Sequence, residues 1–164
     1  MSEHLGHLGI DHIVLERDRI AERWRSARWD SLVANGPAWH DRFPNQEFSC
    51  DKDAFADKES VAAYFVDYAE MIGAPVRTGV CVESVTPHPE RAGFRVETSA
   101  GAVEALRVVC ATGPFQEPAL PQLVPETADV LQMHSTAYRH PDALPDGPVP
   151  VIGARSSGSQ ISAA

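Results

Sequence analysis

The hydrophobic pattern of the chain begins with a short apolar run near the N-terminal end. Residues 10–15 carry Ile10, Ile13, Val14 and Leu15, and the charged pair Glu16 and Arg17 follows directly. A run of this length that ends in charge is typical of a buried strand in a parallel sheet. Ahead of it, Leu5 and Leu8 are three positions apart, which places them on one face of a helix.

The clearest amphipathic helix is predicted to open at residues 57–60. Apolar side chains recur at helical spacing from Val61 to Ile72, and Gly73 then ends the pattern. A shorter helix is expected around Trp24, because Ile20 and Ala27 lie on the same face. Residues 28–50 are rich in aromatic and turn-forming residues, which indicates an ordered loop region.

A β-rich block follows this helix. Valines at 80, 82 and 85 begin it, residues 94–98 alternate apolar and polar as in a half-buried strand, and residues 99–101 can turn the chain. The continuous apolar run 108–111 then predicts a buried strand. The block is therefore expected to form a small antiparallel meander followed by that strand.

The last third of the chain is rich in proline. Residues 114–148 are expected to form an extended connector, interrupted only by a short strand at 130–134. Residues 149–152 predict another strand, which runs into a glycine-containing turn from Gly153 to Gly158 and then into a helix. A strand, a glycine-rich turn and a helix start are the context of a dinucleotide-phosphate loop, although the G-x-x-x-x-G spacing alone is a weak signal.

Glu16 stands where a dinucleotide-binding fold places the acid that hydrogen-bonds an adenosine ribose, at the end of the second strand. The alternative is an ordinary strand that ends in a solvated Glu–Arg pair. That acid follows the glycine-rich fingerprint by about 20 residues. The fingerprint is therefore expected to lie ahead of Met1, so that the chain begins inside a βαβ unit.

Composition narrows the classes of function. The formal net charge is −9, which argues against a nucleic-acid partner, because such partners require basic patches. The three cysteines are far apart and the seven histidines are dispersed, so neither a disulfide framework nor a metal site is expected. No apolar run approaches the ~20 residues of a membrane span, and the N-terminus carries no signal pattern. Cytoplasm is the expected location.

The order of these features resembles the flavin-containing monooxygenase group of two-dinucleotide-domain flavoproteins, in its bacterial flavoprotein branch. The resemblance spans nearly the whole chain and rests on seven short motifs: residues 13–17, 23–25, 29–32, 72–73, 108–113, 134–138 and 151–158. It implies an incomplete α/β, three-layer FAD/NAD(P)-binding Rossmann-like fold with a β-meander. It also implies a partial FAD-binding domain (1–113), the connector (114–148) and the start of an NAD(P)-binding domain (149–164).

The resemblance implies the roles of individual residues as well. Glu16 corresponds to the FAD ribose ligand, with Arg17 beside the adenosine, and Val82 to a backbone contact with the adenine. Trp24 and Trp29 correspond to an aromatic wall near the flavin, although both could equally plug the edge of a core. The turn that passes FAD corresponds to Ala111, Thr112 and Gly113. The NADPH pyrophosphate loop corresponds to Gly153, Ser157 and Gly158.

The implied activity is that of an FAD- and NADPH-dependent oxidoreductase of monooxygenase type acting on a small-molecule substrate. The cofactors carry this chemistry, so no catalytic side chain is expected. The motif that identifies this group of proteins has Phe and Gly ahead of a histidine. Ala128 and Val130 stand at those two places here, so His134 is expected to be a connector residue. Two other interpretations stay open. One is a non-catalytic remnant or interaction fragment, which could self-associate through exposed strand edges. The other is a different two-dinucleotide flavoprotein reductase.

Overall fold

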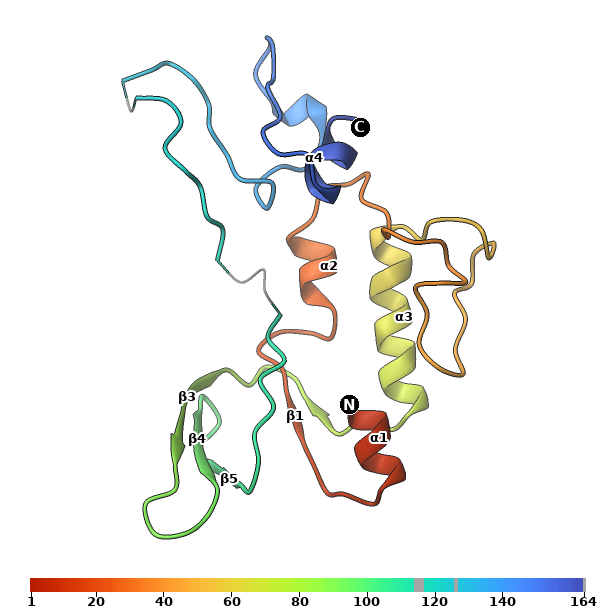
Figure 1. The fold of residues 1–164 in the computed structure, drawn as a ribbon, viewed down its shortest axis with the longest axis vertical. Coiled ribbons are helices and arrows are strands. Elements are labelled where there is room, and N and C mark those ends of the chain that lie inside the picture. Colours follow the sequence, from red (N-terminus) through yellow and green to blue (C-terminus); the bar gives the residue numbers. More distant parts are fainter. Residues whose placement is uncertain (114–116, 126, 164) are drawn as a thin grey trace. The chain divides into compact units, whose positions relative to one another are not determined.

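The computed structural model describes residues 1–113, 117–125 and 127–163, and Figure 1 shows the order of the helices and strands. The chain forms two compact units. The first unit comprises Met1–Ala21 and Phe65–Gly113, and the second comprises Glu22–Tyr64 and Pro114–Ala164. Within the described ranges, no helix is both long enough and apolar enough to cross a membrane.

A pair of parallel strands and a short helix open the first unit. Helix α1 (Ser2–His7) precedes strand β1 (Val14–Leu15), which pairs in parallel with β2 (Val76–Arg77). The Val14 N–H donates to the Pro75 carbonyl at 3.1 Å, and the Glu16 N–H donates to the Arg77 carbonyl at 3.0 Å. The expectation of a parallel strand at this position is therefore confirmed.

The expected burial of this strand is wrong. The side chains of Ile10 and Ile13 are 49% and 37% exposed, and only residues 14 and 15 are in the ladder. Among the described residues β1 has a neighbour on one edge only, so nothing covers the apolar run on the other side. A parallel strand becomes buried only when strands flank it on both edges and helices cover both faces.

Helix α3 (Lys58–Met71) forms where the sequence predicts it. Asp57 caps its N-terminus, because its Oδ1 accepts the Ser60 N–H at 2.7 Å. At the other end, Gly73 adopts φ 59°, and the Ala74 N–H reaches the Ala69 carbonyl at 2.9 Å. A left-handed glycine just beyond the last turn is the usual way to end a helix. Val61, Ala62 and Tyr64 are the buried residues of α3.

The expected antiparallel meander is confirmed. Strands β3 (Val82–Pro87), β4 (Phe94–Thr98) and β5 (Val103–Ala105) are adjacent in that order (Figure 1). The register aligns Val85 with Val96 and Val96 with Val103. Valines directly opposite one another share one face of the sheet, and the central one, Val96, is buried.

The predicted buried strand at 108–111 does not form. These residues belong to no strand, and Val108 and Val109 are 40% and 60% exposed. A continuous apolar run becomes a strand only when a neighbouring strand accepts its backbone hydrogen bonds. No strand in the described part of the chain lies beside it.

The second unit is built around an aromatic cluster. Helices α2 (Glu22–Ser26) and α4 (Ser156–Ile161) and the short 3-10 helix η1 (Pro141–Ala143) contribute to this unit. Its buried cluster consists of Trp29, Leu32 and Tyr138, and four partly buried residues pack against them: Trp24, Met133, Leu144 and Ile161. The Asp30 N–H donates to the Arg139 carbonyl at 2.8 Å, which joins two segments far apart in sequence.

Two further predicted strands are absent from this unit. Residues 130–134 and 149–152 form no ladder, and Val130 and Ile152 are 58% and 73% exposed. Pro148 and Pro150 have no N–H to donate, which weakens any pairing of the second segment. The expected connector 114–148 falls partly outside the described residues, at 114–116 and 126. Its described parts are irregular apart from η1.

Candidate functional site

Glu16 occupies a fixed position at the end of strand β1. Its N–H donates to Arg77, and its carbonyl accepts the Val80 N–H at 3.0 Å. The half-buried side chain turns back along the chain, where Oε1 accepts the Asp18 N–H at 2.9 Å. Both the N–H and the carbonyl of Glu16 are thus bonded to the segment 77–80. Its carboxylate lies at the carboxyl end of a parallel strand, where α/β sheets bind ligands.

Arg17 pairs with the neighbouring carboxylate of Asp18. Its Nε donates to Asp18 Oδ2 at 3.1 Å, and the side chain is exposed. The hydrogen bond from Arg17 to Asp18, together with the negative charge of Asp18, raises the pKa of the guanidinium. Arg17 therefore stays positively charged beside the carboxylates of Glu16 and Asp18.

The remaining predicted residues of the first unit are exposed. Val82 is the first residue of β3 and is 41% exposed. The Val80–Glu16 hydrogen bond brings the segment that leads into β3 alongside the end of β1. Residues 111–113 are exposed, and Gly113 adopts φ 76°. The structure thus brings the approach to Val82 close to Glu16.

The two predicted tryptophans lie in the second unit. Trp29 is 3% exposed within the aromatic cluster, and its buried indole Nε1 has no hydrogen-bond partner in the described part of the chain. Trp24 is half-buried, with the Arg28 guanidinium 5.6 Å from its ring centroid. Burial, and then the charge of Arg23, lowers the pKa of Arg28. Both tryptophans pack in the core of this unit, and their contact with a flavin stays a prediction.

The Gly153–Gly158 turn leads directly into helix α4. Gly153 has φ 119°, a conformation that side-chain-bearing residues rarely adopt. A Cβ on Gly158 would overlap the Gly153 carbonyl oxygen and lie 2.8 Å from its carbonyl carbon. Both glycines are therefore required by the backbone. Ser157 is exposed in the first turn of α4.

Sequence reasoning missed the role of Gln160 in the same helix. Its amide Nε2 donates to the Val33 carbonyl at 3.2 Å, and its Oε1 accepts the Val33 N–H at 3.3 Å. The two residues are 127 positions apart in sequence. No periodicity or motif links them, so the pattern of the sequence carries no signal for this contact.

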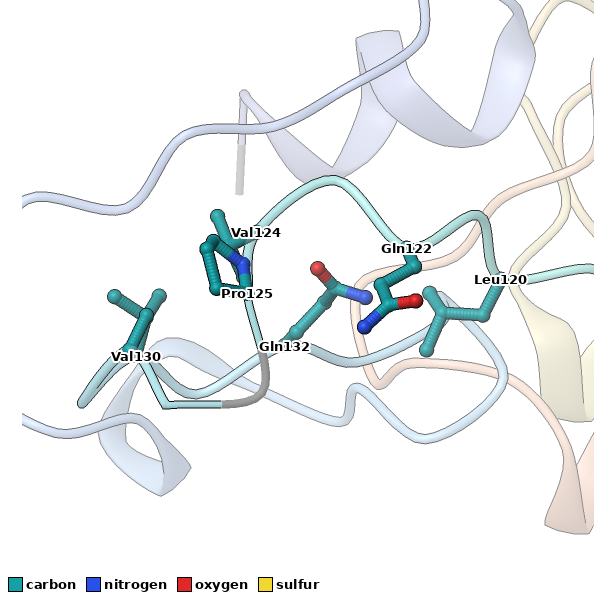
Figure 2. A pocket seen from close by; sticks show the side chains of 7 residues that line it. Leu120, Gln122, Val124, Pro125, Val130 and Gln132 are labelled. Atoms are coloured by element: carbon teal, nitrogen blue, oxygen red, sulfur yellow. The ribbon is translucent and has the colours of Figure 1, made fainter.

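A shallow hollow lies in the connector, and none of the predicted cofactor residues lines it. Figure 2 shows its lining, which consists of Leu120, Gln122, Val124, Pro125, Ala128, Val130 and Gln132. The Gln132 amide closes it by donating to the Pro121 carbonyl at 3.2 Å. The described residues of its lining carry no charged side chain, so these residues offer no group for acid–base chemistry.

Neither metal nor disulfide chemistry is supported by the side chains that the structure describes. Within these ranges, His, Cys, Asp and Glu form no cluster able to hold a metal ion. Cys50, Cys81 and Cys110 are free thiols. The first two are half-buried and the third is exposed.

The family model described as pyridine nucleotide-disulphide oxidoreductase matches residues 1–163. The chain belongs to this family. Among the relatives of similar sequence is the uncharacterized oxidoreductase CzcO-like of Geobacillus kaustophilus. It is 37% identical over 150 residues, which cover 91% of this chain and 42% of that protein. The chain thus spans less than half the length of this relative.

Solved structures show the fold of this family member. The flavin-containing monooxygenase from Stenotrophomonas maltophilia superposes with a TM-score of 0.71 at 23% identity, over 87% of this chain and 43% of that one. The crystal structure of OTEMO in complex with FAD and NADP superposes with a TM-score of 0.59 at 16% identity, over 73% of this chain and 24% of that one. The expected α/β Rossmann-like fold with a β-meander is therefore confirmed. The resemblance to flavin monooxygenases is confirmed by sequence relatives, among them the flavin-containing monooxygenase FMO GS-OX-like 1 of Arabidopsis thaliana, which is 30% identical over 98% of this chain and 38% of that protein. The individual cofactor contacts stay predictions.

Proposed function

We propose that this chain is part of an FAD- and NADPH-dependent oxidoreductase of monooxygenase type that acts on a small molecule. The observation that carries the proposal is the turn from Gly153 to Gly158, where the backbone requires two glycines, Gly153 just ahead of helix α4 and Gly158 in its first turn. The family match over residues 1–163 supports the same class of protein.

The turn fits the pyrophosphate of NADPH. Gly158 has no Cβ, which lets the first turn of α4 lie against the Gly153 carbonyl. The first N–H groups of a helix have no partner within the helix. Such N–H groups at the start of a helix favour a phosphate. Gly153, Ser157 and Gly158 are proposed to hold the pyrophosphate, with the Ser157 hydroxyl as an additional donor.

The end of β1 fits the ribose of FAD. A carboxylate anchored at the carboxyl end of a parallel strand can accept hydrogen bonds from ribose hydroxyls. We propose Glu16 for this role, with Arg17 flanking the adenosine and the Val82 backbone beside the adenine. Residues 111–113 are proposed to pass the flavin, and Trp24 and Trp29 to form the wall of its site.

The cofactors, when bound, supply hydride transfer and the activation of dioxygen. The residues of this chain bind and orient them, and no side chain is proposed as an acid, base or nucleophile. The three free thiols, distant in sequence, favour this class over a disulfide reductase. A cytoplasmic location and the absence of a nucleic-acid partner are part of the proposal, supported by the free thiols and the net charge of −9.

The test is a calorimetric titration of the chain with NADP⁺ and NAD⁺, repeated on two glycine variants. Gly158→Ala is expected to abolish NADP⁺ binding, because the new methyl group cannot fit against Gly153. Gly6→Ala is the matched control, since nothing lies within 4 Å of its added Cβ and its φ is ordinary. Binding that survives in Gly158→Ala, or equal affinity for NADP⁺ and NAD⁺, would contradict the proposal.

A further inference from the structure

The segment from Leu32 to Asn35 is hydrogen-bonded like a strand on one side. The Lys58 N–H donates to the Leu32 carbonyl at 3.1 Å, and the Ala34 N–H donates to the Ala56 carbonyl at 2.7 Å. In extended backbone, successive peptide groups point in opposite directions. The N–H and carbonyl of Val33 therefore face away from residues 56–58.

The Gln160 side chain meets both of these groups. Its amide donates to the Val33 carbonyl and accepts the Val33 N–H, and its Nε2 also lies 3.3 Å from Asn35 Oδ1. A side-chain amide carries the same donor and acceptor as a peptide group, so Gln160 occupies the place that a neighbouring strand would fill. Val33 is half-buried, and losing both partners would leave a costly unsatisfied pair.

Gln160 also belongs to α4, the short helix that begins within the Gly153–Gly158 turn. Its neighbour Ile161 packs against the cluster of Trp29, Leu32 and Tyr138. The helix is thus attached at its C-terminal end by one polar contact and one apolar contact. In the first turn of the helix, Gly158 lies against Gly153.

We infer that Gln160 is a positioning residue that holds the Gly153–Gly158 turn in its ligand-binding shape by anchoring α4 to the backbone of Val33. This inference rests on the proposed NADPH site. Six residues make too little helix to be stable by themselves, so the orientation of α4 is set by its attachments. Gln160 touches no cofactor atom in this role.

The test compares Gln160→Leu and Gln160→Glu with Ser159→Ala in the full chain. Ser159 is an exposed neighbour on the same helix, and its variant should behave as wild type. Hydrogen exchange of the ligand-free protein should accelerate about tenfold in Gln160→Leu at residues 159–162, where the Ser159 and Ser162 amides donate within α4. Residues 61–69 of α3 should be unchanged. The dissociation constant for NADP⁺ should rise by about tenfold, the equivalent of about 1.4 kcal/mol.

Gln160→Glu supplies a rescue. At pH 8 its carboxylate can accept the Val33 N–H but cannot donate to the Val33 carbonyl, so NADP⁺ binding should be weak. Near pH 4, below the ordinary glutamate pKa of about 4.3, protonation restores a donor, and the ratio of variant to wild-type dissociation constants should fall toward one. A side chain that only fills space would show no such pH dependence.

The outcomes separate this inference from the proposed function. If wild type binds NADP⁺ and Gln160→Leu binds it equally well, the inference is wrong and the cofactor site stands. If wild type binds no NADP⁺, the proposed function fails, and exchange at residues 159–162 decides whether Gln160 holds α4 in place. Equal acceleration along the whole chain would mean a general loss of stability and would also overturn the inference.

Discussion

The ring of Tyr64 lies parallel to the ring of Phe48, with 4.0 Å between their centroids and 14° between their planes. Phe43 stacks on Tyr64 as well, at 5.8 Å. The Tyr64 hydroxyl accepts the Phe43 N–H at 2.7 Å and donates to the Gln46 carbonyl at 3.1 Å. One residue of α3 therefore organises much of the loop between Phe43 and Phe48.

Replacing Tyr64 separates the contribution of the hydroxyl from that of the ring. Tyr64→Phe should lower the free energy of unfolding by roughly 1–3 kcal/mol, because two backbone groups lose their partner. Tyr64→Ala should cost more, about 3–5 kcal/mol, since it also removes a buried ring. Urea denaturation measures both values. Equal losses in the two variants would mean that the stacking contributes nothing.

The cap of α3 should make stability depend on pH in the acidic range. Hydrogen bonds from Ser60 lower the pKa of Asp57 in the folded chain. A carboxyl group whose pKa is lowered on folding stabilises the protein above its unfolded pKa, about 3.9. That contribution is lost as the pH falls through the folded pKa.

The variants Asp57→Asn and Asp57→Ala isolate this effect. The alanine variant should lose about 1 kcal/mol at pH 7, because the cap is removed. The asparagine variant keeps a neutral cap, so its difference from wild type should be constant above about pH 5 and shrink below about pH 4. Urea denaturation at several pH values is the measurement. A difference that grows on acidification would contradict the assignment.

Ala21 has a left-handed backbone, with φ 61°. A side chain in this conformation costs roughly 1–2 kcal/mol, which glycine avoids. Ala21→Gly should therefore stabilise the chain by up to about 1 kcal/mol, after the entropy of the unfolded glycine is subtracted. Ala69→Gly, within α3, should destabilise it by about the same amount. A thermal melt that moves in the same direction for both would refute this reading of Ala21.

FAD affinity should report on Glu16. Glu16→Gln removes the charge but keeps an acceptor for the Asp18 N–H. Since hydrogen bonds to charged groups contribute roughly 1.5–3 kcal/mol, FAD should dissociate about ten times more readily or worse. Equilibrium dialysis against FAD measures this change. Glu83→Gln, in the exposed strand β3, is the control. Equal FAD affinity in the two variants would mean that Glu16 is an ordinary solvated acid at the end of a strand.

The edge of the meander should support self-association. Within the described residues, β5 pairs only with β4, and the exposed side chains of Leu106 and Val109 follow it. Unpaired edges with apolar neighbours are templates for association. Sedimentation should show concentration-dependent oligomers that the double variant Leu106→Lys/Val109→Lys weakens. Leu123→Lys, which lies outside any strand, should have no effect, and a monomer at all concentrations would contradict the prediction.

Local patterns in the sequence were enough to predict the helices and strands whose hydrogen bonds join residues close in sequence. The apolar periodicity and the glycine of α3 predicted its course, because helical hydrogen bonds and caps join residues close in sequence. The alternation at 94–98 and the turn at 99–101 predicted the meander for the same reason. The order of the short motifs also predicted the family, which the match over residues 1–163 confirms.

Tertiary structure alone decided which apolar runs are paired and buried. Residues 10–15 and 108–111 have similar patterns, yet only Val14 and Leu15 enter a ladder, because only they have β2 beside them. A strand needs a partner strand, and a local sequence pattern does not identify that partner. The same holds for Gln160 and Val33, which meet across 127 positions. The sequence by itself determined the helices, the meander and the family, whereas long-range hydrogen bonds decided how the candidate turn is held.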